Sequence, residues 1–220
     1  MIEVQGFPWC KGERRSVGIS GLTSKILCTD HNSRLSELDI AAGHAFKSFD
    51  KVSQETNARL IGKDTRFKVH HVNIDGPRLE RWLVKTLLNL HVSGSMAGGG
   101  QPSGVSEHLV RIAFGSEAFK GKSGLYLAAR QGWQLNSRNE IKVTPLIDDG
   151  IIMGGFFNFR GWLLILWPYE NEMPKSLDGC GLGDEWHGVE PSWHFKTINF
   201  DVRNIRSHVV NFVWPKAASS

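Results

Sequence analysis

The chain has 220 residues, of which 40% are hydrophobic and 22% charged, a composition that excludes an intrinsically disordered protein. Its formal charge of +4 is mildly basic, without the basic stripe of a dedicated DNA binder. No apolar run approaches the roughly 20 residues of a membrane-spanning helix, and the first residues lack the pattern of a secretory signal. We therefore expect a cytoplasmic location and no membrane partner.

Charge is unevenly distributed along the chain. Residues 1–90 contain 14 Lys and Arg against 10 Asp and Glu, a balance of +4, whereas residues 91–220 contain 12 of each kind. Because phosphate contacts need lysine and arginine, any nucleic-acid contact should favour the first part. The alternative is that these charges are ordinary solvated surface.

The first part, residues 1–92, is predicted to be rich in helix. Residues 24–28 are expected to form a short strand, followed by a helix over 33–49 that Ser33 or Ser36 can cap. Its apolar positions recur at helical spacing: Leu35, Leu38, Ala42, Ala45, Phe46 and Phe49. Residues 66–74 alternate as in a strand, which places His70 and His71 on opposite faces.

The clearest predicted helix covers residues 77–91. Asp75 precedes it as a candidate cap, and Pro77 suits the first helical position. Its apolar stripe is broad, comprising Leu79, Trp82, Leu83, Thr86, Leu87 and Leu90, and is widened by Val84 and Leu88. A stripe of this width predicts a largely buried helix that anchors both parts of the chain.

A Gly- and Ser-rich stretch, residues 93–105, predicts a flexible linker or loop before the second part, residues 106–220. That part is expected to be an antiparallel sheet, with strands over 124–130, 140–144, 150–158, 161–167, 193–201 and 208–214. Residues 159–161 suit a hairpin turn, and 168–191 an exposed excursion. The predicted class is α+β: a strand–turn–helix element and a buried helix packed on this sheet, together one compact domain.

Potential metal ligands gather at the start of the first predicted helix. Cys28 and His31 lie three positions apart at a turn, a spacing from which both side chains can reach one zinc ion. Cys10 is a candidate third ligand, and His44, His70, His71 or Cys180 could supply the fourth. The alternative reading makes Cys28 a small buried hydrophobe, His31 a capping or surface residue and Cys10 a loop cysteine.

The segment Ile26-Leu-Cys28, His31-Asn32 and Leu35-Ser-Glu-Leu-Asp39 resembles the second half of HNH-type, treble-clef endonuclease modules. It is more closely similar to a group of bacterial proteins that carry a degenerate form of this module. Residues 74–87 also resemble that group. The resemblance covers about a quarter of the chain and implies no fold for the second part.

The resemblance implies metal-assisted phosphodiester hydrolysis, in which a histidine acts as general base and a divalent cation such as Mg²⁺ stabilises the scissile phosphate. Asn32 would orient the histidine, and structural zinc would be held by Cys10, Cys28 and His31. No histidine precedes His31, and the first Cys-x-x-Cys pair is absent. Either the module is therefore a non-catalytic relic, or the base comes from elsewhere, with His31 or His44 at the site. Phosphates of DNA or RNA would meet four basic residues, Arg14, Arg15, Lys25 and Arg34.

Three functions follow as hypotheses. The first is an HNH-related protein that binds or processes nucleic acid, with or without catalytic activity. The second is a non-catalytic, oligomerising or protein-binding module whose sheet bears the interface through its tryptophans, Trp162, Trp167, Trp186, Trp193 and Trp214. The third is a small-molecule hydrolase with its site in the 168–191 excursion.

Overall fold

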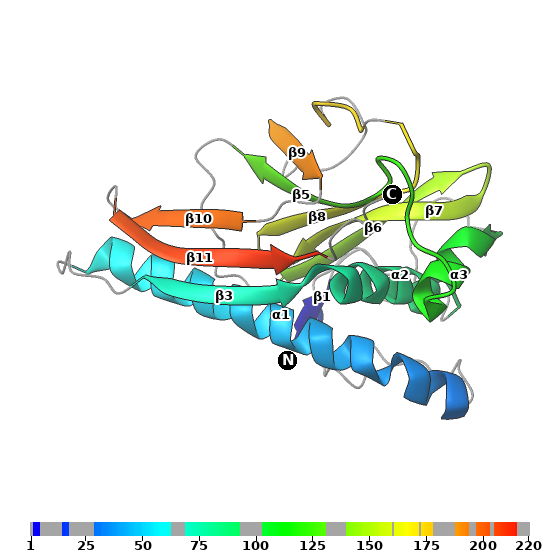
Figure 1. The fold of residues 1–220 in the computed structure, drawn as a ribbon, viewed down its shortest axis with the longest axis horizontal. Coiled ribbons are helices and arrows are strands. Elements are labelled where there is room, and N and C mark those ends of the chain that lie inside the picture. Colours follow the sequence, from blue (N-terminus) through cyan, green and yellow to red (C-terminus); the bar gives the residue numbers. More distant parts are fainter. Residues whose placement is uncertain are drawn as a thin grey trace, which may run out of the picture.

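The computed structural model describes residues 2–4, 15–17, 29–62, 69–92, 103–130, 140–159, 161–171, 173–177, 188–193, 197–202 and 205–214. Its described helices are α1 (Thr29–Ile61), α2 (Gly76–Val92) and α3 (Glu107–Phe114). These helices pack against two sheets, which confirms the α+β class (Figure 1). None of the described helices combines the length and the hydrophobicity that crossing a membrane requires.

The described strands form one large and one small sheet. The large sheet has the order β2-β1-β6-β7-β8-β5-β9, with β4 paired to β7, and the small sheet has the order β10-β11-β3. The bounds of the strands are β1 Ile2–Val4, β2 Arg15–Val17, β3 His70–Asp75, β4 Gly104–Val105, β5 Gly124–Arg130, β6 Glu140–Asp148, β7 Ile151–Phe159, β8 Trp162–Trp167, β9 Val189–Trp193, β10 Thr197–Val202 and β11 Ile205–Val213.

The small sheet joins segments that are far apart in sequence. β3 pairs in parallel with β11, so that His71 lies opposite Val209 and Asn73 opposite Asn211 (Figure 1). The amides of this last pair are bonded, with Asn211 Nδ2 donating to Asn73 Oδ1 at 3.1 Å. The helix-rich first part therefore shares a sheet with the end of the chain.

β8 shows why its sequence is a continuous apolar run. Trp162, Leu164 and Leu166 point into the main core, where α1, α2 and α3 contribute their apolar faces. Leu163 and Ile165 point to the opposite side of the same sheet and pack in a second cluster. Because successive side chains of a strand alternate, a strand covered on both faces needs apolar residues throughout.

The second cluster corrects the expectation of a wholly exposed excursion after β8. Met173 and Leu177 are 7% and 3% exposed and cover the outer face of the large sheet. Apolar side chains spaced four apart in an irregular segment can bury without helix or strand, a pattern that periodicity does not detect. Residues 178–187 lie outside the described part of the chain.

α2 begins close to its predicted start. The Arg78 amide donates to Asp75 Oδ1 at 3.0 Å, which confirms Asp75 as the cap of the first turn. Gly76 is required here because a Cβ atom would lie 2.7 Å from the ring of Trp214. α2 is buried along Leu79, Leu83, Val84 and Leu87, as its stripe predicts.

α1 is longer than predicted and begins earlier. His31 and Asn32 lie in its first turn rather than in a turn that precedes the helix. Ser33 and Ser36 are not caps, because Ser36 Oγ donates to the Ser33 carbonyl from inside the helix at 2.7 Å. The strand predicted over 24–28 lies outside the described residues.

In the second part, β5 has its predicted bounds. The turn between β7 and β8 is also confirmed, since Phe159 pairs with Trp162 and Gly161 has a φ of 90°. The strand predicted over 193–201 is wrong, because the described structure has two strands there, β9 and β10, in different sheets. Four described elements have no counterpart among the predicted ones: β1, β2, β4 and α3.

A partly buried ion pair ties α1 to α2. Lys85 Nζ lies 2.8 and 2.7 Å from the two carboxylate oxygens of Asp39, and its side chain is only 7% exposed. Trp82 Nε1 also donates to Asp39 Oδ1 at 3.1 Å. One carboxylate therefore satisfies a buried ammonium group and an indole on the adjacent helix.

Replacing Asp39 tests this connection. Asp39→Ala leaves the Lys85 ammonium buried without its carboxylate and should lower the free energy of unfolding by about 2 kcal/mol in urea denaturation. Asp39→Ala combined with Lys85→Met removes the stranded charge and should recover most of this loss. Glu37→Ala is the matched control, because its 3.5 Å ion pair with Arg78 is exposed and should contribute at most about 0.5 kcal/mol. Equal effects of Asp39→Ala and Glu37→Ala would contradict this account.

Candidate functional site

Of the residues predicted to form a site, His44 alone has a described side chain. Four of the others lie outside the described residues: Cys10, Arg14, Lys25 and Cys28. The remaining four are placed only by their backbone, with Arg15 in β2 and with His31, Asn32 and Arg34 in α1. The predicted zinc ligands and phosphate contacts therefore stay predictions.

His44 lines a hollow of about 500 Å³ between α1 and the edge strand β3. We call this feature the basic hollow. Its described lining consists of His44, Lys47, Ser48, Lys51, His71, Val72 and Asn73. The basic hollow brings together two of the histidines named as possible fourth zinc ligands, His44 and His71. The third, His70, does not line it.

The helical wall of the hollow follows from the spacing of its residues. Positions 44, 47, 48 and 51 recur at intervals of three and four, so they share one face of α1. The opposite face of the same turns carries Ala45, Phe49 and Val52, which are fully buried. Burial of the apolar face therefore directs the basic face away from the core.

The charges of the basic hollow are of one sign. Its basic side chains include Lys47 and Lys51, and no carboxylate is among the described lining residues. Glu55 lies one turn further along α1, 3.8 Å from Lys51 and 3.9 Å from His70. An exposed pair of this kind contributes little free energy, so Lys51 can exchange Glu55 for another anion.

The other wall of the hollow is a strand edge. Among the described strands, β3 pairs with β11 alone and forms the edge of the small sheet. In a parallel pair the alternate residues of an edge strand turn their N–H and C=O groups away from the neighbour. The hollow along residues 71–73 thus adjoins backbone donors and acceptors as well as side chains.

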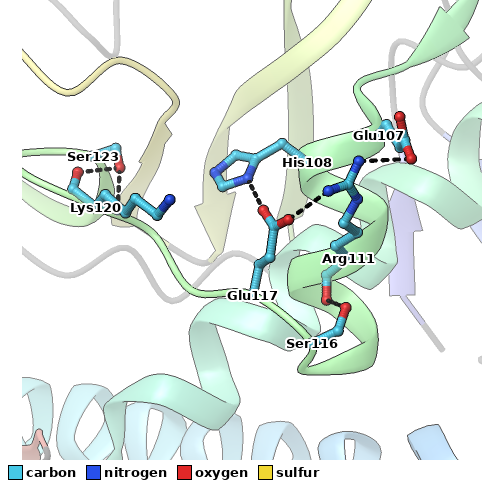
Figure 2. Close-up of polar contacts among 7 residues, drawn as sticks. All are labelled: Glu107, His108, Arg111, Ser116, Glu117, Lys120 and Ser123. Atoms are coloured by element: carbon cyan, nitrogen blue, oxygen red, sulfur yellow. Dashed lines mark hydrogen bonds and ion pairs between the residues drawn. The ribbon is translucent and has the colours of Figure 1, made fainter.

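A second polar cluster surrounds α3 and the loop that follows it (Figure 2). Glu117 bonds His108 Nδ1 through one carboxylate oxygen and Arg111 through the other, both at 2.7 Å. Arg111 also lies 2.7 Å from Glu107. Hydrogen bonds from His108 and Arg111 lower the pKa of Glu117, and the two glutamates raise the pKa of Arg111.

This cluster has the hydrogen-bond pattern of an oriented base but the setting of a structural anchor. Because an ionised Glu117 can only accept, His108 Nδ1 carries the proton and Nε2 is the basic atom. The same loop is held by backbone bonds from Gly115 and Ser116 to the last turn of α3. These bonds tie the loop after α3 to the helix itself, so we assign the cluster to fixing the loop between α3 and β5.

Three residues that line the basic hollow were not predicted as site residues: Lys47, Lys51 and Asn73. Lys47 was detectable, because it lies three positions after His44 on the polar face of a predicted helix. Lys51 lies beyond the predicted end of that helix, and Asn73 joins the site only through the packing of β3 beside α1.

Within the described residues, no three His, Cys, Asp or Glu side chains come together in a group that could hold a metal ion. No protein-family model, no curated protein and no solved structure matches this chain. The HNH resemblance therefore stays a prediction that depends on residues 26–39 and 74–87.

Acid should weaken the Glu117 anchor. The pKa of Glu117 is lower in the folded protein than its ordinary value of 4.5, so its stabilising contribution is present above that value and is lost as the pH falls through the folded pKa. Glu117→Gln should therefore lower the melting temperature at pH 7 and have a progressively smaller effect below pH 4.5. Thermal unfolding across this range measures the difference, with the exposed Glu170→Gln as control. An effect of Glu117→Gln that grows toward acid pH would contradict the assignment.

Proposed function

We propose that this protein binds nucleic acid by holding the phosphodiester backbone in the basic hollow. The observation that carries the proposal is the composition of the lining: two lysines and two histidines without a carboxylate among the described residues. Lysine contacts to phosphates release counterions, which supplies most of the affinity that does not depend on sequence.

The spacing of the two lysines supports a linear polyanion as the ligand. Lys47 and Lys51 are four residues apart, so their positions along α1 differ by about 6 Å. Both belong to one face of one helix and can contact different phosphates of the same strand.

The HNH-like segment runs into the same helix that carries the basic hollow, with His31 about 20 Å from His44 along the axis of α1. This distance corresponds to about three and a half turns of the helix. His44 is a candidate base under the HNH resemblance, and it lies beside the two lysines that would hold a phosphate. Cleavage with a divalent cation, and the roles of Asn32 and His44 in it, stay predictions beyond this binding function.

Removing the lysines should weaken binding and reduce its dependence on salt. Binding of a fluorescent oligonucleotide, followed by anisotropy between 50 and 300 mM KCl, should give a slope of log Kobs against log salt that falls by about 2 in Lys47→Gln/Lys51→Gln. Affinity at low salt should drop by roughly tenfold or more, because two phosphate contacts are lost.

Lys120→Gln/Lys175→Gln is the matched control. It removes the same charge from exposed lysines that do not line the hollow, and it should leave the slope nearly unchanged. Equal losses in the two double variants would show that net charge, and not the basic hollow, drives the binding. Absence of binding by the unmodified protein would overturn the proposed function.

A further inference from the structure

The basic hollow has two walls of different chemistry. The α1 wall offers two ammonium groups and an imidazole, which attract phosphates. The β3 wall offers the exposed His71 and a strand edge beside Val72. The α1 wall alone would be enough to bind phosphates. The β3 wall therefore indicates which other part of the ligand the protein contacts.

We propose that the basic hollow selects single-stranded over duplex nucleic acid, an inference that rests on the nucleic-acid binding proposed above. The strand would lie with its phosphates on Lys47 and Lys51 and with a base turned toward β3. His44 from α1 and His71 from β3 both line the hollow in which that base would lie.

The size of the hollow favours a single nucleotide unit. The hollow is an open depression of about 500 Å³, which leaves room for one nucleotide unit without enclosing it. A duplex is a convex rod, and proteins read it by inserting a helix or strand into its grooves. It would meet Lys47 and Lys51 at its surface and leave the hollow between α1 and β3 unfilled.

The β3 edge favours a base that is not paired. In a duplex the Watson–Crick edges of the bases are occupied, whereas a single strand can turn them out to hydrogen-bond with protein groups. β3 is the edge of its described sheet, and alternate residues of an edge strand direct backbone donors and acceptors outward. These groups suit base edges better than phosphate oxygens, because they include acceptors as well as donors.

The two imidazoles add a face for stacking. His44 and His71 are both exposed, and histidine is among the side chains on which unstacked bases pack. Stacking is available only when a base leaves its own stack, and it tolerates any sequence because every base has a flat face. This contribution belongs to single strands and is absent for an intact duplex.

Competition by strand type tests the inference. Anisotropy at pH 7.5 and 100 mM KCl should show a 12-nucleotide single strand, as DNA and as RNA, bound at least about tenfold more tightly than a duplex of the same sequence. His44→Ala/His71→Ala should lower single-strand affinity about tenfold and leave duplex affinity nearly unchanged. Lys47→Gln/Lys51→Gln should weaken both ligands by a similar factor.

The outcomes separate the two proposals. Equal or tighter binding of the duplex would overturn strand selection while leaving nucleic-acid binding in place. Binding of neither ligand would overturn the proposed function itself. An acidic 12-residue peptide that displaces the single strand at equal concentration would overturn both and indicate a protein partner that pairs with β3. Thermal unfolding of each variant establishes that it is folded.

Discussion

The contact between Asp39 and Lys85 constrains how α1 lies along α2. Lys85 is buried on α2, and Asp39 reaches it from α1 with both carboxylate oxygens. An ammonium group at 7% exposure requires such a partner, so the register of α1 along α2 is constrained at this point. His44 follows Asp39 by five residues on the same helix, and its position is set accordingly.

α2 carries a second buried charge that fixes the opposite layer. Glu80 is 8% exposed, and its Oε1 accepts the backbone N–H of Leu125 at the start of β5 at 2.7 Å. One helix thus makes a charge-assisted contact to α1 on one side and to the large sheet on the other (Figure 1). Between these contacts its apolar stripe fills the main core, which makes α2 the element that connects all layers.

Hydrophobic periodicity in the sequence was sufficient to predict helices and strands that bury a regular stripe or run of their own side chains. The apolar stripe and cap of α2, and the apolar run of β8, are examples, because each buries side chains at the period of its own backbone. The second half of α1 was not predictable in this way. Ser53 is a buried polar residue in this half of α1. Its hydroxyl is satisfied by donating to the Phe49 carbonyl and by accepting from Trp162 Nε1 at 3.3 Å. Trp162 lies 109 positions away, beyond the reach of any local pattern.

The basic hollow shows the same limit at the level of function. His44 was identifiable as a candidate from its place after the HNH-like segment, but its neighbours were not. β3 lies beside α1 in the fold because it pairs with β11, and the bonded amides of Asn73 and Asn211 are 138 positions apart. A site built from a helix face and a strand edge requires that long-range pairing, which single-sequence periodicity does not contain.

Amide hydrogen exchange with a bound single-stranded oligonucleotide tests the central claim most directly, because it locates the ligand without any substitution. The account predicts added protection in peptides that cover residues 71–73 of β3 and 44–51 of α1, with little change around α3 and its loop. Protection confined to other surfaces, with exchange in β3 unchanged at saturating oligonucleotide, would contradict the assignment of the basic hollow as the binding site.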